Sequence, residues 1–256
     1  MKNEPEPKAT RRTLLAGMAL MATSAALPAR AETAGGPTAA GATAGAKHVV
    51  LLGDSIFDNK RYVGDGPDVI EELKGDLPAG WTASLNAIDG STTQDIAGQI
   101  KRLPPDATHL VVSVGGNDAL KHKDMLEEKA SSVAGVLDRL GKIRGEFQAN
   151  YRAMLDVVLA TKLPAAVCTI YEANYKNSDT DRIAATGLAV FNDIITREAF
   201  ARGVPLIDLR LIVNDDADYA NEVEPSSIGG AKIAKVIATL VTTADFKQTR
   251  SVVFAG

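Results

Sequence analysis

Three short polar segments of the sequence contain side chains that are suited to acyl transfer. The segment GDS carries Ser55, the segment DGS carries Gly90, and the segment GGND carries Asn117. Acyl transfer from an ester requires a nucleophile and hydrogen-bond donors for the oxyanion that forms on the attacked carbonyl. The Ser55 hydroxyl is the candidate nucleophile, and the Gly90 N–H and the Asn117 amide are the candidate donors. A plain strand-to-helix turn at GDS is the alternative interpretation.

These polar segments follow apolar, β-branched runs that have the length and composition of strands. Five such runs occur, at 48–52, 81–88, 108–114, 165–170 and 204–209. Segments with helical spacing of apolar residues lie between and after them, at 67–77, 93–103, 146–161, 181–201 and 228–241. Strand and helix therefore alternate five times along the chain.

The alternation predicts an α/β fold, in which a parallel sheet carries helices on both faces. The near-continuous hydrophobicity of VVLL and LVVSV fits strands that are buried on both sides. In such sheets the ligand site lies at the carboxyl ends of the strands. We therefore expect Ser55, Gly90 and Asn117 at one edge of the sheet, with the turn at 221–230 returning to the same edge.

The three polar segments resemble, in order and separation, the first three sequence blocks of the SGNH hydrolases, also called the GDSL esterase and lipase family. The resemblance extends over about residues 48–240. It implies a flavodoxin-like, three-layer α/β/α sandwich, here with a five-stranded sheet. It also implies that Ser55 is the nucleophile and that the Ser55 N–H, the Gly90 N–H and the Asn117 side chain form the oxyanion hole.

The fourth block of the family reads Asp-x-x-His before a proline, and this sequence departs from it. Aligned on Pro225, Glu224 takes the place of the histidine and Asn221 the place of the aspartate. A free glutamate, with a pKa of about 4.3, is a weaker proton acceptor than histidine, and burial raises that pKa. We predict that Glu224 accepts the Ser55 proton, directly or through water. The alternative is a helix N-terminal acid that the helix dipole stabilises.

The three histidines do not replace the missing base in an obvious way. His48 and His109 begin strands, so both are expected a strand's length away from Ser55. His122 lies on the correct side, but its surroundings, KHKD, are typical of a solvated face. Asp218 is a further candidate to replace the missing acid.

Five further polar residues are predicted to line the substrate pocket: Asp54, Asp58, Asn59, Tyr171 and Asn221. Local turn and cap roles are the alternative for the first three, and a surface loop is the alternative for Tyr171. The only cysteine, Cys168, lies in an apolar run and is predicted to be a buried structural thiol. No cluster has metal-ligand spacing and no phosphate-binding glycine loop occurs, so we expect neither a metal nor a cofactor.

The N-terminal segment at 1–31 has the pattern of an export signal. Arg11 and Arg12 precede an apolar core, and Ala31 ends a small-x-small cleavage motif. The arginine pair resembles the twin-arginine type, and export to the periplasm or the medium is predicted. An uncleaved membrane anchor is the alternative, although the apolar stretch is shorter than the roughly 20 residues of a span. The predicted organisation is a signal at 1–31, a flexible linker at 32–46, one domain at 47–245 and a tail at 246–256.

The composition is that of a soluble globular protein, with 256 residues, 45% hydrophobic and 23% charged, and a formal net charge of -4. Without a basic stripe, neither nucleic acid nor an anionic membrane is expected as the main partner. The predicted activity is that of a serine esterase on a small acyl ester or an O-acetylated sugar. The alternative is a noncatalytic ligand-binding pseudo-hydrolase that keeps the pocket. The sequence carries no indication of the oligomeric state.

Overall fold

The computed structural model of the protein describes residues 45–248 and 250–256. The predicted export signal and all but the last two residues of the predicted linker lie outside the described residues. The first strand begins at Lys47. Within the described part of the chain, no helix is both long enough and apolar enough to cross a membrane.

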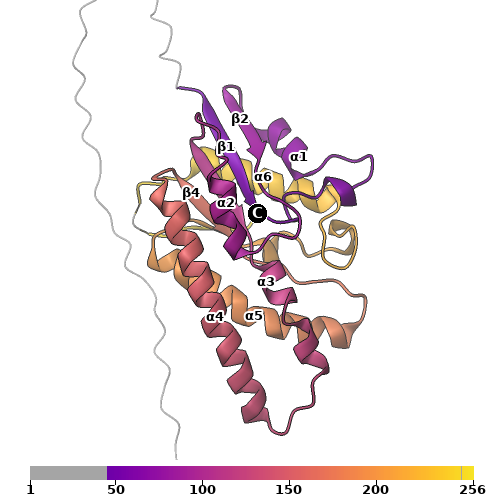
Figure 1. Cartoon of the computed structure of the whole chain (residues 1–256). Helices are drawn as coiled ribbons and strands as arrows, with labels where there is room; N and C mark the ends of the chain where they lie inside the picture. Colours follow the sequence, from indigo (N-terminus) through magenta and orange to yellow (C-terminus); the bar gives the residue numbers. More distant parts are fainter. Residues whose placement is uncertain (1–44, 249) are drawn as a thin grey trace, which may run out of the picture. The chain divides into compact units, whose positions relative to one another are not determined.

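A parallel sheet of six strands forms the centre of the fold, in the order β2-β1-β3-β4-β5-β6 (Figure 1). The strands are β1 (Lys47–Gly53), β2 (Trp81–Leu85), β3 (His109–Ser113), β4 (Ala165–Cys168), β5 (Leu206–Ile207) and β6 (Val253–Phe254). The Val and Leu side chains of β1 and β3 are buried on both faces, which explains their continuous hydrophobicity. The predicted α/β fold with a parallel sheet is confirmed.

The sheet has one strand more than the five predicted. The additional strand, β6, lies in the segment predicted to be a tail and pairs with β5. Leu206 N–H donates to the Val252 carbonyl at 2.9 Å, and Asp208 N–H donates to the Phe254 carbonyl at 2.8 Å. A strand of two residues is too short to show a periodic pattern in the sequence.

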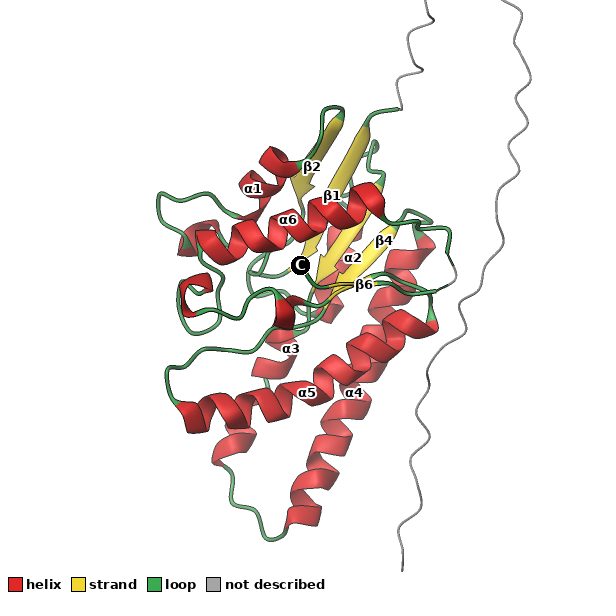
Figure 2. Cartoon of the chain, turned by 180° about the vertical axis from the view of Figure 1, so that it is seen from behind, coloured by secondary structure: helices red, strands yellow, loops and turns green. Residues whose placement is uncertain are grey.

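Helices cover both faces of the sheet (Figure 2). They are α1 (Val69–Asp76), α2 (Ile96–Ile100), α3 (Gly116–Leu120), α4 (Val133–Ala160), α5 (Ser178–Ala201) and α6 (Ser227–Thr243). Short 3-10 helices are η1 (Lys60–Tyr62), η2 (Thr93–Asp95), η3 (Lys123–Glu127), η4 (Leu209–Leu211) and η5 (Asp216–Asp218). Helices α1 and α6 pack on one face, whereas α2, α4 and α5 pack on the other.

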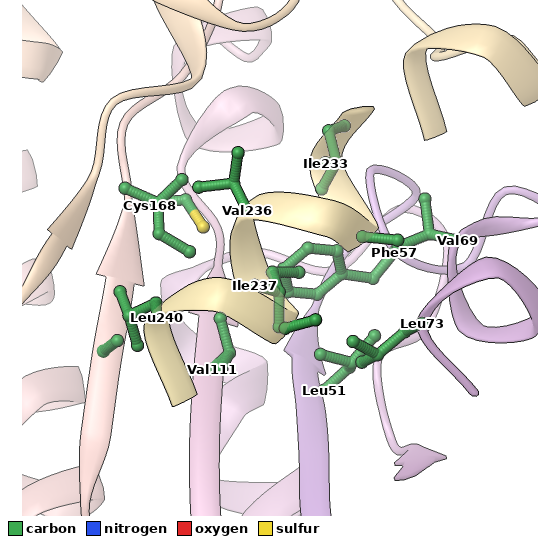
Figure 3. Packing of buried hydrophobic residues seen from close by; sticks show 14 of the residues in the cluster. Leu51, Phe57, Val69, Leu73, Val111, Cys168, Ile233, Val236, Ile237 and Leu240 are labelled. Carbon is green, nitrogen blue, oxygen red and sulfur yellow. The ribbon is translucent and has the colours of Figure 1, made fainter. Parts of the chain in front are cut away.

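The two faces have separate apolar cores. Figure 3 shows the first core, where Ile233, Ile237 and Leu240 of α6 pack over Leu51 and Val111 of the sheet. Helix α6 is apolar along this face, and the burial of its side chains holds it against the strands. This packing fixes the start of α6, and therefore the segment before it, relative to the end of β1.

The segment from β3 to α4 contains more helical structure than the sequence predicted. Helix α4 begins at Val133, well before the predicted start at 146, and the connection also contains α3 and η3. Figure 1 shows α3 and the first turns of α4 beyond the carboxyl ends of the strands. These helices stand beside the edge of the sheet where the site was expected.

Candidate active site

Ser55, the candidate nucleophile, lies two residues beyond the end of β1. Gly53 has φ +137°, and a Cβ atom there would lie 1.8 Å from the Ser113 carbonyl oxygen, so only glycine fits between β1 and β3. The Gln99 side chain holds the same residue, accepting from Gly53 N–H at 2.8 Å and donating to its carbonyl at 2.7 Å. The constrained turn places Ser55, which is 6% exposed, in the wall of a cavity.

Glu224 reaches this cavity from the segment before α6, and its carboxylate contacts the Ser55 hydroxyl. Burial raises the pKa of Glu224 above its ordinary value, although the hydrogen bond from Ser55 opposes this effect. The negative charge of Asp89 raises the pKa further, and the positive charge of Arg61 lowers it. Oε2 of Glu224 is buried and has no hydrogen-bond partner among the described residues. A carboxylate with a free lone pair beside a hydroxyl is able to accept its proton.

The backbone that carries Glu224 is held by two side chains that were predicted to contact substrate. Asn221 Oδ1 accepts hydrogen bonds from the N–H groups of Val223 and Glu224, both at 2.9 Å. The Tyr171 hydroxyl donates to the Val223 carbonyl at 2.7 Å, and the buried Tyr171 ring lines the cavity. The structure thus gives Asn221, which is exposed and does not line the cavity, the role of ordering the turn.

Asn59 supports the same segment from the other side. Its side chain is fully buried, donates from Nδ2 to the Pro225 carbonyl at 3.1 Å, and accepts from Val69 N–H at 3.0 Å. Asn59 does not line the cavity, and both ends of its amide are engaged within the protein. It therefore joins the start of α1 to the residue that follows Glu224.

The two candidate oxyanion donors lie in neighbouring turns. Asn117 lines the cavity, and its Nδ2 donates to the Ser91 carbonyl at 3.0 Å, which ties the turn after β3 to the turn containing Gly90. The amide has a second N–H that this bond does not use. Gly90 has φ +81°, and no atom lies within 4 Å of where a Cβ would be. Its backbone conformation favours glycine, although Gly90 is not among the residues that line the cavity.

Asp54 lies beside Ser55 and is 2% exposed. Its Oδ1 accepts from Ile56 N–H at 3.1 Å, which stabilises the turn that presents Ser55. Burial raises the pKa of Asp54 to about 8, with smaller contributions from the charges of Glu224 and Asp118. Asp54 therefore keeps its proton at neutral pH and adds no negative charge beside Ser55.

A group of charged and phenolic side chains, absent from the predicted site, surrounds the backbone next to Gly90. Asp89 Oδ2 accepts from the Tyr62 hydroxyl at 2.9 Å and from the Arg61 guanidinium at 3.0 Å. Asp58, which was predicted to contact substrate, accepts from Asp89 N–H at 2.9 Å. Asp58 does not line the cavity, and it fixes the turn of the candidate donor Gly90. Only the position of Asp89 next to Gly90 could have indicated this group from sequence.

His48 and His109 lie where their strand positions predicted. His48 hydrogen-bonds to Ser84 Oγ at 2.8 Å, at the amino ends of the strands. His109 packs against Trp81 and Phe246, and its burial lowers its pKa to about 4. His122, in contrast, lines the cavity that contains Ser55.

Asp218 and Cys168 belong to the interior of the protein. Asp218 is fully buried, forms an ion pair with Lys232 and accepts from the N–H groups of Asn214 and Asp215. Asp218 therefore anchors α6 and does not line the cavity. Cys168 is a buried free thiol, and desolvation raises its pKa, as expected of a structural cysteine. Among the residues that the structure describes, no cluster of His, Cys, Asp and Glu could hold a metal ion.

The fold and the comparisons with known proteins define the chain as an α/β ester hydrolase. It belongs to the GDSL-like lipase/acylhydrolase family, whose model matches residues 51–228. The family predicted from the three polar segments is thereby confirmed. No curated protein matches the chain.

Solved structures with the same fold are distant in sequence. An extracellular lipase from Streptomyces rimosus is 18% identical, with a TM-score of 0.56, and the alignment covers 78% of this chain and 100% of the lipase. A lipolytic protein of the G-D-S-L family from Veillonella parvula is 16% identical, with a TM-score of 0.58 and coverages of 78% and 100%. An acetyl xylan esterase from Geobacillus stearothermophilus is 18% identical, with a TM-score of 0.51 and coverages of 77% and 94%. At these identities the likeness establishes the fold.

Proposed function

We propose that the protein is a serine ester hydrolase in which Ser55 is the nucleophile and Glu224 is the proton acceptor. The observation that carries the proposal is the contact between the Glu224 carboxylate and the Ser55 hydroxyl inside one cavity. Burial raises the pKa of Glu224 toward the operating pH, which makes a carboxylate a better base. Small acyl esters and O-acetylated sugars are the proposed substrates.

The reaction follows from the position of these two groups. Ser55 Oγ attacks the ester carbonyl carbon while its proton passes to Glu224, which gives a tetrahedral intermediate with a negative oxygen. Collapse of the intermediate breaks the bond to the alcohol oxygen, and protonated Glu224 returns its proton to the leaving alcohol. Water then attacks the acyl-enzyme with Glu224 again as base, and the acid and free Ser55 are released.

The negative oxygen of the intermediate requires donors that are already oriented. We assign this role to the N–H groups of Ser55 and Gly90 and to the free N–H of the Asn117 amide. Their neighbours hold them in place, since Asn117 is bonded to the Ser91 carbonyl. The proton on Asp54 keeps a second negative charge away from the developing oxyanion at neutral pH. Each oriented donor is worth about 100- to 1,000-fold in rate.

Covalent labelling by a fluorophosphonate tests the proposal, because the reagent modifies a serine only when its hydroxyl is activated. The wild-type protein is expected to label, whereas Ser55→Ala is expected not to label. Thr169→Val, which removes a hydroxyl at the same cavity, serves as the control and is expected to label. Absence of labelling from pH 5 to 9 would favour the second candidate, a noncatalytic ligand-binding protein. This candidate is supported by Glu224 Oε2, which has no hydrogen-bond partner among the residues that the structure describes and so lacks the orienting acid of an Asp-His pair.

We further propose that the protein is exported and works in the periplasm or the medium. The support is the sequence pattern of the N-terminal segment, with Arg11 and Arg12 before an apolar core. Expression of the full chain in a bacterium, followed by N-terminal sequencing of the exported protein, tests this proposal. Cleavage after Ala31 is expected, and replacement of both arginines by lysine is expected to retain the protein in the cytoplasm.

A further inference from the structure

The cavity at Ser55 extends far beyond the reacting groups. Its volume is about 180 Å³, and it runs from Ser55 and Glu224 to a space enclosed by α3, η3, α4 and α5. Figure 1 shows these helices together on the side of the sheet where the strands end. A ligand whose ester group lies at Ser55 would therefore have one of its two sides in this space.

The chemistry of the walls changes along the cavity. Carboxyl, hydroxyl and amide groups line the cavity at the strand ends and in the turns that follow, from Asp54, Ser55, Ser113, Asn117, Thr169 and Glu224. Tyr171 and Tyr175 line it from the loop between β4 and α5. Every residue that α4 and α5 contribute to the lining is apolar: Leu140, Ile143, Ile183, Ala184, Gly187, Leu188 and Phe191. A sugar ring in that part would lose its hydrogen bonds to water without replacement, which is costly. An alkyl chain makes no hydrogen bonds to water and would therefore lose none on entering that part.

The apolar walls also reach the protein surface. Leu126 of η3 is 52% exposed and Ile183 of α5 is 48% exposed, and both line the cavity. These side chains face water at the mouth of the cavity, and an apolar ligand would cover them. Beside this part of the cavity, the lining residues with a charge or an imidazole are Lys123 of η3 and His122, which directly precedes η3.

We propose that this part of the cavity, which we call the acyl pocket, binds the hydrocarbon chain of a medium-length acyl ester. The inference rests on the proposed function and, of its two substrate candidates, favours acyl esters with a chain of roughly eight carbons over O-acetylated sugars. The whole cavity of about 180 Å³ has room for on the order of ten water-sized groups, and a methylene is similar in size, so an ester group at Ser55 leaves room for roughly eight carbons. Acetyl esters would leave the acyl pocket empty.

A series of p-nitrophenyl esters with two, four, six, eight and twelve carbons tests the proposal. kcat/KM is expected to rise about fourfold per methylene up to roughly eight carbons and then to level off, since each buried methylene adds a similar free energy. Equal values along the series, or a maximum at acetate, would contradict the acyl pocket while leaving the ester hydrolase intact.

Gly187→Leu tests the location of the chain. Gly187 lines the acyl pocket, and no atom lies within 4 Å of where its Cβ would be, so a side chain can begin there without a clash at Cβ and leucine is expected to extend into the pocket. The ratio of kcat/KM for octanoate to acetate esters is expected to fall at least tenfold. Gly145→Leu on α4 is the matched control, because Gly145 has the same open surroundings and does not line the cavity. An unchanged ratio in Gly187→Leu would overturn the proposal.

Binding of octanoate, measured by calorimetry, separates the two proposals. If no ester is hydrolysed, the proposed catalytic function fails. In that case, octanoate binding that Gly187→Leu weakens at least tenfold and Gly145→Leu preserves still supports the acyl pocket. Absence of octanoate binding to the wild-type protein, together with absence of hydrolysis, contradicts both.

Discussion

The Tyr171 hydroxyl donates a 2.7 Å hydrogen bond to the Val223 carbonyl, so that a residue following β4 holds the peptide directly before Glu224. The ring of Tyr171 packs edge-on against Tyr219 at 5.7 Å. The position of Glu224 beside Ser55 therefore depends on a part-buried contact between residues that are more than 50 positions apart in the sequence.

Tyr171→Phe is expected to lower kcat/KM about 3- to 30-fold and the free energy of unfolding by about 1 kcal/mol, because it leaves the Val223 carbonyl unpaired. Tyr219→Phe is the matched control, since its hydroxyl bonds to the Glu172 carbonyl at 2.7 Å and Tyr219 does not line the cavity. Ester hydrolysis and urea unfolding measure the two effects. Equal losses of activity in both variants would show that the Val223 contact has no special role.

The pH dependence of hydrolysis should report the ionisation of Glu224. The base must be deprotonated, so kcat/KM is expected to rise with pH through the pKa of Glu224. Burial raises this pKa, which places the midpoint above the ordinary value of 4.5. Glu224→Gln is expected to lose this acidic limb and about 100- to 10,000-fold of the rate. The same acidic limb in Glu224→Gln would remove Glu224 from the mechanism.

The buried carboxyl of Asp54 should make the protein less stable as the pH rises. Its pKa is about 8 in the folded state against an ordinary value of 3.8, so between these values the folded state holds a proton that the unfolded state has lost. Stability from this group is therefore present below about pH 4 and lost as the pH rises to about 8.

Asp54→Asn keeps the acceptor for Ile56 N–H and removes the titration. Urea unfolding at pH 5 and at pH 8 gives the stability lost between these two pH values. This loss is expected to be larger for the wild type than for the variant, by on the order of 1 kcal/mol or more. An equal loss of stability between pH 5 and pH 8 in the wild type and the variant would mean that Asp54 is ionised in the folded state.

Gly53→Ala should disrupt the junction of β1 and β3. The added Cβ would lie 1.8 Å from the Ser113 carbonyl oxygen, at a residue with φ +137°. A loss of several kcal/mol in the free energy of unfolding is expected. Gly80→Ala is the control, since Gly80 also has a positive φ, +86°, but open space around it, and a loss of about 1 kcal/mol is expected there. Thermal unfolding compares the two, and similar losses would contradict the steric argument.

Most of the fold was predictable because buried parallel strands are apolar throughout. The strands that were missed or misjudged are those with few residues, such as β6 with two. The start of α4 was predicted too late because its first turns contain glycines and exposed apolar side chains, Val133 and Leu137, which do not form the periodic pattern of a packed helix.

The candidate site was predictable only in part. Ser55 and Asn117 could be selected by residue type and by their positions after strands, and Glu224 by its alignment with the histidine of the family's fourth block. The structure places all three around one cavity. The supporting contacts were not predictable, because Asn59 and Pro225 are 166 residues apart and polar residues in turns have several possible partners. The acyl pocket was missed for the same reason, since its walls come from three separate helices and η3.

The sequence by itself determined the class of fold and the family, because alternating apolar segments and short polar turns are local features of the chain. Tertiary structure alone decided that Glu224 meets Ser55, that Asp54 keeps its proton, and that the cavity continues between apolar helices. The physical reason is that pKa values and cavities depend on burial and on neighbours that are distant in sequence, and these arise only when the helices pack on the sheet.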